Sequence, residues 1–491
     1  MKRDTLFYGF VFLLAVANGM IMNHKISLWE GPESMMVWKG LHGSLGSLPQ
    51  ELAASIGYMG GEVDTFWLRF PVSLFAVFSL FIFWLVGKPI LGKRLVLNTL
   101  LCVSASLLVF NLAKVASGDL WALMSQLMTY ILLLRYLKQP KLQWQIGFYA
   151  AFALSIWIQP LNSLLFILLF ASWLYLRHPK GKNLIRLFPW GAGLVTFGVL
   201  YFLNIIDLQQ HTHIIGFNSL KFFSWNLVGI LPFIGFAIAG IWETYKRSNK
   251  GEEMGIINIG FFFAALLSHA LVLQFLLAML AGKQLTSYFD PKYPHKNPVR
   301  AGAVIHLIAA VLGLTYFMLW VFFQFKGPGF RSGLVVCGLY WMWSVIAVIG
   351  IYGMNENYVR LGTIISGVLF TSLFWLQLGP LMESRRDIPT RLLAVAQKTA
   401  PDTEDEIDCI ILPAEGKPFT NVAPYAKLAY PSTIIAEGQN LQSLSTASAN
   451  PKLILYNWQY TTLQDSTQQI KGWSSRIAPN SYGWKWLDAS Q

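Results

Sequence analysis

The chain has 491 residues, of which 55% are hydrophobic and only 12% are charged, and its mean hydropathy is +0.48. Soluble globular proteins carry about 25% charged residues, so this composition excludes a water-facing shell over most of the chain and predicts an integral membrane protein. The net charge of +13 is what basic cytoplasmic loops produce, and it gives no reason to expect a nucleic-acid partner.

A membrane-spanning helix needs about 20 mostly apolar residues. We expect twelve such helices, near 5–22, 67–87, 95–113, 118–135, 145–159, 161–177, 187–204, 222–243, 256–280, 301–323, 332–352 and 359–379. Pro160 marks either a tight turn or a kink within one long helix. The run 256–280 is long enough to tilt or break.

Lys and Arg concentrate in alternate loops, at Lys2 and Arg3 and within 88–94, 135–141, 177–186 and 246–250. Because basic loops stay in the cytoplasm, we expect a cytoplasmic N-terminus in the plasma (inner) membrane. The long first loop, 23–66, then faces outward. Twelve spans return the C-terminus to the cytoplasm and thirteen place it outside, and the sequence leaves both open.

The tail differs from the hydrophobic part. Residues 381–491 are polar, with β-prone runs near 407–412, 432–435 and 453–456 and a helical stretch at 391–398. We therefore predict two domains: an all-α polytopic membrane domain over 1–380 and a small soluble α/β domain over 381–491. The cysteines, Cys102, Cys337 and Cys409, show no pairing or metal-ligand spacing.

Carboxylates occur where the chain emerges on the predicted outer face. Glu30 and Glu33 open the first loop, and Asp119 lies at the short outer turn between the spans 95–113 and 118–135. The two glutamates are either ordinary solvated residues or a general base at the membrane surface. Asp119 is either a helix N-cap or part of the same site.

A third group, 282–300, is basic and aromatic and lies on a predicted outer segment, against the charge bias of the other loops. It includes Lys283 and Tyr288, which are suitable donors to a phosphate. The alternative is a belt of residues that contacts lipid headgroups. His211 and His213 lie in another loop without further metal ligands, so we treat them as ordinary loop residues.

The order of these motifs resembles the membrane glycosyltransferases of the GT-C fold, in particular protein O-mannosyltransferases and lipid A aminoarabinose transferases. The run 66–76 contains Arg69-Phe70-Pro71, similar to the family's Arg-x-Pro entry into the second span. The loop 87–94 resembles the basic, glycine-containing loop that follows. Gly282-Lys283 with Tyr288 and Pro291 resembles the family's Gly-Lys…Tyr-x-x-Pro motif, with one extra residue.

The resemblance also assigns the acids. Pro32-Glu33 stands where the family has an Asp-Glu pair, so the role of base falls to Glu33 or Glu30, and Asp119 stands at the family's second outer-loop aspartate. The arginine that often precedes that aspartate is missing, although Lys114 is near. The resemblance implies that Lys283, Tyr288 and Arg69 bind the donor phosphate.

The family transfers a hexosyl or pentosyl group from a polyprenyl-phosphate donor to a protein, lipid or glycan acceptor on the outer (periplasmic) face, with inversion. The resemblance therefore predicts a glycosyltransferase of the cell envelope, active in protein glycosylation or lipid A modification, without metal or cofactor. Two other functions stay open: a transporter or flippase of lipid-linked or small anionic substrates, and a non-catalytic scaffold with this fold. Ionisable residues near the membrane midplane are typical of transporters, and here they are rare.

Overall fold

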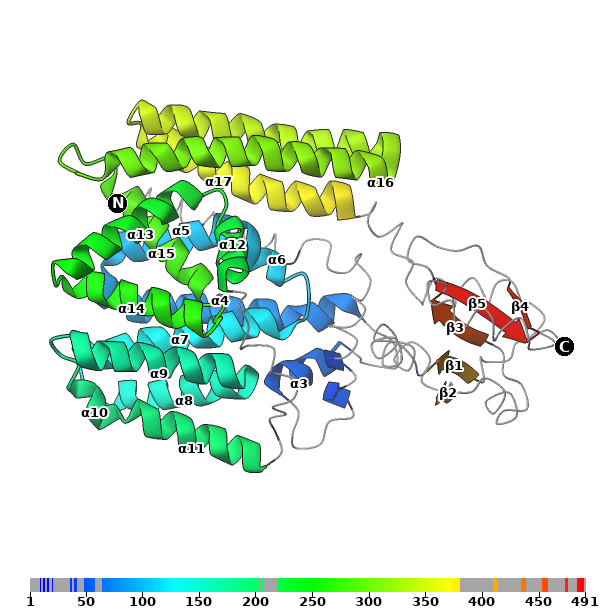
Figure 1. Ribbon diagram of the computed structural model, residues 1–491, viewed down its shortest axis with the longest axis horizontal. Coiled ribbons are helices and arrows are strands. Elements are labelled where there is room, and N and C mark those ends of the chain that lie inside the picture. Colours follow the sequence, from blue (N-terminus) through cyan, green and yellow to red (C-terminus); the bar gives the residue numbers. More distant parts are fainter. Residues whose placement is uncertain are drawn as a thin grey trace. The chain divides into compact units, whose positions relative to one another are not determined.

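The computed structural model, drawn in Figure 1, describes scattered positions between 9 and 41, residues 48–57, 64–203, 205 and 219–379, and five short strands after residue 408. The chain divides into two compact units, of which one contains Arg69–Leu378 and the other contains the strands. The predicted span 5–22 and most of the first loop lie outside the described residues.

Helices make up most of the described chain. They are α3 (Pro49–Ser55), α4 (Thr65–Leu91), α5 (Lys93–Ala105), α6 (Leu107–Leu112), α7 (Gly118–Lys138), α8 (Leu142–Ile158), α9 (Pro160–Arg177), α10 (Asn183–Leu187), α11 (Pro189–Phe202), α12 (Ser219–Gly229), α13 (Ile234–Asn249), α14 (Glu253–Leu267), α15 (Leu273–Ser287), α16 (Lys296–Tyr352), α17 (Glu356–Leu373) and the π-helical turn η3 (Phe374–Leu378).

Among these residues, seven segments are long and apolar enough to cross a membrane. They are Thr65–Leu91, Gly118–Lys138, Pro160–Arg177, Asn183–Phe202, Lys296–Phe323, Gly329–Tyr352 and Glu356–Leu378. The chain is therefore mostly helical and suited to a bilayer, as its composition predicts. The expected total of twelve or thirteen spans stays a prediction.

Two predicted spans are not single helices. The expected helix 222–243 is wrong as a continuous element, because the chain leaves the helical conformation between α12 and α13, where Pro232 has no N–H to donate. The run 256–280 breaks into α14 and α15, and His269 takes a left-handed backbone conformation between them (φ 51°). At this second break the chain reverses direction, so α14 and α15 replace the single predicted span 256–280.

The segment around Pro160 is a tight turn. Gln159 alone separates α8 from α9, and Pro160 is the first residue of α9, where a missing N–H costs nothing. The two helices pack side by side (Figure 1). The alternative of one kinked helix is excluded.

The helix α16 folds back on itself. A straight helix of its 57 residues would be about 85 Å long. Instead, the Trp341 indole N–H donates to the Ala310 carbonyl (3.3 Å), and the rings of His306 and Tyr340 lie 6.0 Å apart. The two membrane-length arms of α16 are therefore antiparallel and correspond to the predicted spans 301–323 and 332–352.

The helical unit has two ends that can be told apart by contacts. The Lys138 ammonium donates to the carbonyl of Ile90 (3.2 Å), so α7 and α4 finish together. We name this the Lys138 end. The opposite end, where α7 begins, is the Asp119 end, and the Trp375 indole N–H reaches Asn111 Oδ1 there (2.7 Å).

Aromatic rings fill part of the core between α7, α9 and α14. The ring centroid of Phe261 lies 4.2 Å from that of Tyr130 and 5.3 Å from that of Phe166. All three side chains are fully buried. Such rings contribute a large buried area with defined geometry, and they fix the helices that carry the polar residues at both ends.

The described strands form one mixed sheet. They are β1 (Cys409–Pro413), β2 (Ile434–Gly438), β3 (Leu453–Asn457), β4 (Trp473–Ser475) and β5 (Trp484–Ala489), in the order β2-β1-β3-β5-β4. β1 pairs in parallel with β2 and β3, whereas β5 is antiparallel to β3 and β4. The predicted helical stretch 391–398 lies outside the described residues, so an α/β domain stays a prediction.

Candidate functional site

Asp119 lies in the first turn of α7, with its side chain exposed. The residue that caps α7 is Ser117, so Asp119 is not the N-cap. The Ser117 hydroxyl donates to Asp119 Oδ2 (3.3 Å). The carboxylate therefore lies at the very start of the helix, open to a partner at the Asp119 end.

Two buried cations lie at the same end. Arg69, near the start of α4, and Lys114, in the turn between α6 and α7, are both fully buried. Burial and, to a smaller extent, the positive charge of Arg69 lower the pKa of the Lys114 amine from 10.5 to about 7. Two cations that repel each other in a region of low dielectric favour an anion nearby.

An indole and an amide complete this cluster. Lys114 Nζ lies 5.9 Å from the centre of the Trp375 ring, in η3. Trp375 in turn donates to Asn111 in α6, and the Asn111 amide donates to the Leu107 carbonyl (2.5 Å). The ammonium is thus held between α6 and η3. We call Arg69, Asn111, Lys114 and Trp375 the cationic cluster.

Sequence reasoning assigned a role to Arg69 and noted that Lys114 is near Asp119, but it missed Trp375 and Asn111. Both lie within predicted apolar spans. A Trp near the end of a span is also typical of the interface with lipid headgroups, so no sequence signal distinguished it.

The structure places Lys283 elsewhere. Its ammonium lies 3.2 Å from the carboxylate of Glu243, which is 1% exposed. Glu243 also forms an ion pair with Arg247 (2.6 Å), and its Oε2 accepts from the Gln284 amide (2.5 Å) and from the Tyr293 hydroxyl (2.9 Å). This network joins α13 to α15.

Tyr288 is fully buried, and its hydroxyl donates to the Ile351 carbonyl (2.8 Å) and accepts from Arg300 Nε (3.3 Å). Thr286, one turn from Lys283, accepts from the Asn98 amide (2.8 Å), which lies near the start of α5. Lys283 and Tyr288 are therefore at the Lys138 end, and the structure does not bring them together with Arg69 or Asp119.

The glutamates proposed as base, Glu30 and Glu33, lie outside the described residues, as do His211 and His213. Within the part of the chain that the structure describes, no three His, Cys, Asp or Glu side chains are grouped so that they could hold a metal ion.

Comparisons with known proteins identify the class of fold. The family described as dolichyl-phosphate-mannose-protein mannosyltransferase matches residues 50–205. No curated protein matches the sequence. Two crystal structures of ArnT from Cupriavidus metallidurans are similar: one bound to undecaprenyl phosphate (TM-score 0.67, 12% identity) and one in the apo state (TM-score 0.69, 11% identity). Each comparison covers 99% of this chain and 98% of ArnT.

An archaeal oligosaccharyltransferase from Archaeoglobus fulgidus, tethered with an acceptor peptide, gives a TM-score of 0.47 at 10% identity, over 99% of this chain and 74% of the other. The likeness to ArnT extends over nearly the whole of both chains. The predicted resemblance is confirmed: the chain has the GT-C fold of membrane glycosyltransferases.

Proposed function

We propose that this protein is a membrane glycosyltransferase that moves a sugar from a polyprenyl-phosphate donor to a protein, lipid or glycan acceptor. The fold supports this proposal, and the similar ArnT is described as bound to undecaprenyl phosphate. The cationic cluster is the observation that carries it. A buried guanidinium and a buried ammonium beside an indole suit a phosphate group, and they lie at the end that carries Asp119, in the first turn of α7.

In this proposal Arg69 and Lys114 bind the donor phosphate. Glu33 or Glu30 accepts the proton of the acceptor hydroxyl while its oxygen attacks the anomeric carbon. The bond from that carbon to the phosphate oxygen breaks on the opposite side, so the configuration inverts. The electron pair leaves with the phosphate, and the two cations stabilise it there. Asp119 orients the acceptor or the loop that carries the base.

The assignment of Lys283 and Tyr288 to the donor phosphate is not part of the proposal. Their polar atoms contact Glu243 and Ile351 at the Lys138 end. A phosphate held there would be separated from Asp119 by the length of the helices. Arg69 is the member of the predicted trio that lies at the Asp119 end.

The distribution of Lys and Arg supports an assignment of the two ends of the helical unit to the two sides of the membrane. Most described Lys and Arg residues gather at the Lys138 end, namely Lys88, Lys93, Arg94, Arg135, Lys138, Lys141, Arg177, Lys180, Lys182, Arg186, Lys246, Arg247, Lys250, Lys283, Lys292, Lys296 and Arg300. We assign this end to the cytoplasm. The Asp119 end then faces the periplasm, across the inner membrane.

The break between α14 and α15 changes the side of the membrane on which we expect the tail. It makes thirteen spans with a cytoplasmic N-terminus, if 5–22 is a span, and α17 then runs from the cytoplasm to the outer face. The pair of Arg94 with Glu356 (3.3 Å), at the start of α17, supports that direction. We propose that the tail forms a small α/β domain on the same side as Asp119.

A transfer assay tests the enzyme. The full chain in liposomes receives a panel of polyprenyl-phosphate hexoses and pentoses together with membrane extract as acceptor. We expect sugar-dependent release of free polyprenyl phosphate. It should be lost in Asp119→Asn and in one of Glu30→Gln and Glu33→Gln, and retained in Lys141→Gln, an exposed control at the Lys138 end. No release with any donor from folded protein contradicts the proposal.

A further inference from the structure

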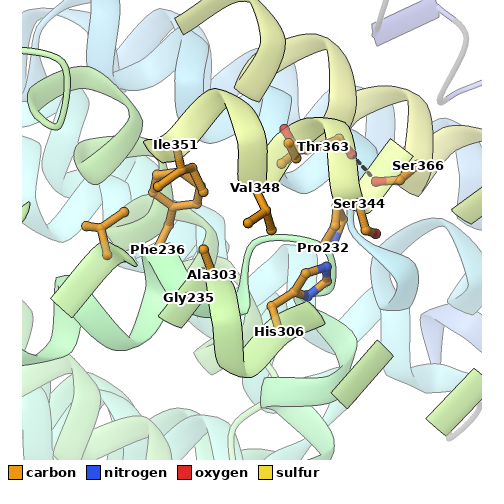
Figure 2. A pocket seen from close by; sticks show the side chains of 12 residues that line it. Pro232, Gly235, Phe236, Ala303, His306, Ser344, Val348, Ile351, Thr363 and Ser366 are labelled. Carbon is orange, nitrogen blue, oxygen red and sulfur yellow. Dashed lines mark hydrogen bonds between the residues drawn. The ribbon is translucent and has the colours of Figure 1, made fainter. Parts of the chain in front are cut away.

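A small cavity lies inside the helical unit, between the start of α13, the two arms of α16 and α17 (Figure 2). Apolar side chains such as Phe236, Val348 and Ile351 form much of its wall. It has room for about one water molecule, so it is too small for a lipid or a sugar. A larger ligand needs a surface, and the surface around the short helix α10 carries an unbalanced positive charge.

Four cations surround α10. Arg177 ends α9, Lys180 and Lys182 lie in the turn before α10, and Arg186 lies within α10. All four residues are exposed, and none of them forms an ion pair with a described carboxylate. The sequence supplies no acid nearby, because residues 120–206 contain neither Asp nor Glu. We call Arg177, Lys180, Lys182 and Arg186 the α10 patch.

One residue of α14 adds a negative charge at the border of the patch. The Glu253 carboxylate lies 3.3 Å from Nε2 of His178, which directly follows α9. The turn between α13 and α14 has a different balance, since Arg247 there pairs with Glu243 (2.6 Å) and with Glu252 (3.1 Å). The α10 patch therefore keeps a net positive charge that its own chain does not neutralise.

The helix α10 is fixed on the helical unit. Leu184 and Leu187 are fully buried. The Asn183 amide donates to the Leu137 carbonyl near the end of α7 (3.4 Å), and the Tyr149 hydroxyl in α8 donates to the Leu187 carbonyl (2.6 Å). The backbone that carries the four cations is therefore already ordered, so a ligand does not have to order it on binding.

The position of α10 corresponds to the boundary between hydrocarbon and lipid headgroups. α10 begins the membrane-length segment Asn183–Phe202. The Trp173 indole N–H donates to the Ile256 carbonyl (2.8 Å), and the Arg177 guanidinium carbon lies 5.5 Å from the centre of the Trp173 ring. Trp190 follows α10 directly, at the start of α11. Trp side chains collect at this boundary, so the patch faces headgroups.

Apolar side chains lie among the cations. Ile185 is 54% exposed and Phe188 is 61% exposed, next to Lys182 and Arg186 in the sequence. A short helix with this mixture suits the membrane interface, where acyl chains cover the apolar side chains and phosphates contact the cations. Basic clusters at the cytoplasmic end of a membrane helix are typical of anionic-lipid binding. We propose that the α10 patch binds the headgroup of an anionic phospholipid, with phosphatidylglycerol as the simplest case.

A basic loop has a second common role, which is to orient the chain while its cations stay in water. In that role it does not distinguish an anionic lipid from a zwitterionic one. Phosphatidylcholine has the same phosphodiester and acyl chains as phosphatidylglycerol but no net charge, so a comparison of the two separates the roles. The proposal needs only that the chain lies in a bilayer and does not depend on transferase activity.

The test is equilibrium binding of fluorescent phosphatidylglycerol and phosphatidylcholine to the purified full chain in micelles of a neutral detergent. The variants are Lys180→Gln/Lys182→Gln, which removes two charges, and Lys180→Arg/Lys182→Arg, which retains them. Lys93→Gln/Lys292→Gln is the matched control, because it removes two exposed charges from other elements at the Lys138 end. A photoactivatable phosphatidylglycerol, cross-linked to wild type and mapped by mass spectrometry, is the second measurement.

We expect wild type to bind phosphatidylglycerol at least about tenfold more tightly than phosphatidylcholine. Lys180→Gln/Lys182→Gln should lose this preference, whereas Lys180→Arg/Lys182→Arg and Lys93→Gln/Lys292→Gln should keep it, and the cross-links should include residues 177–188. The proposal is overturned if wild type binds the two lipids equally, if both glutamine pairs weaken binding equally, or if the cross-links lie only elsewhere. Displacement of the lipid by an equal concentration of inorganic phosphate would also overturn it, in favour of a soluble anion.

Discussion

Lys283 and Glu243 form an ion pair, with Nζ 3.2 Å from Oε1, at the end of the helices opposite Asp119. Glu243 is almost fully buried and is also bound by Arg247 and Tyr293. The Gly-Lys part of the sequence motif therefore joins helices in this chain, whereas the buried cations near Asp119 are Arg69 and Lys114.

We expect Lys283→Gln to lower the free energy of unfolding by about 3 kcal/mol, because it leaves a buried carboxylate without one of its cations. Thermal or denaturant unfolding in detergent measures this. Lys292→Gln, an exposed neighbour, should be neutral. Transfer per folded molecule should not change in either variant. Loss of transfer in Lys283→Gln with unaltered stability would return Lys283 to the donor site.

Gly282 has a packing role that Gly313 lacks. A Cβ on Gly282 would lie 2.7 Å from the Thr99 backbone nitrogen, whereas nothing lies within 4 Å of one on Gly313. We expect Gly282→Ala to destabilise the protein by about 1–3 kcal/mol through overpacking of α15 against α5. Gly313→Ala should be neutral or slightly stabilising. Equal unfolding midpoints for the two variants would contradict this packing.

The lowered pKa of Lys114 predicts a pH dependence. Only the ammonium form attracts phosphate, and the pKa of this amine is about 7, so kcat/KM for the donor should fall by up to about tenfold per pH unit above that value. Lys114→Arg should flatten the profile, because a guanidinium stays charged. A pH-rate profile between 6 and 9 measures this, and identical profiles for the two proteins would contradict it.

The same lowered pKa predicts how the stability of the donor-free protein depends on pH. Between about 7 and the ordinary value of 10.5, the unfolded chain holds a proton on Lys114 that the folded chain does not. Stability of the donor-free protein should therefore rise with pH in this range. In Lys114→Met this contribution should be absent, as unfolding at several pH values would show.

Sidedness can be measured by cysteine labelling. Cys102 and Cys337 are buried, so a Cys409→Ser background leaves an added cysteine as the main target. A membrane-impermeant maleimide applied to intact spheroplasts should label Lys221→Cys, at the start of α12, and not Lys292→Cys, at the Lys138 end. The reverse pattern would contradict the assignment of the Asp119 end to the periplasm.

Sequence periodicity predicted the helical class well, because apolar runs of membrane length carry a strong signal. It failed where a run is interrupted without losing its apolar character. Neither Pro232 nor His269 changes the hydropathy of its segment enough to show that the chain stops and starts again there. The twelve-span prediction counted 256–280 as one span, and this assigned 282–300 to the same side as Asp119, whereas the structure has this segment at the Lys138 end.

The same miscount explains why the predicted site residues divide between the two ends of the helices. Arg69 and Asp119 lie close to where their spans begin, so an error further along the chain did not move them. Lys283 and Tyr288 come after the break between α14 and α15 in the chain, so the miscount moved their predicted position from one end of the helices to the other. Trp375 and Asn111 join the cluster only through tertiary packing, which local sequence does not encode.

The most direct test is equilibrium binding of polyprenyl phosphate to the purified protein in nanodiscs. The account predicts that Arg69→Gln and Lys114→Gln each weaken binding at least tenfold, since a charged hydrogen bond contributes about 1.5–3 kcal/mol. Lys141→Gln, exposed at the other end, should bind as wild type does. Wild-type affinity in both Arg69→Gln and Lys114→Gln, with both variants folded, would contradict the assignment of the donor phosphate to the cationic cluster.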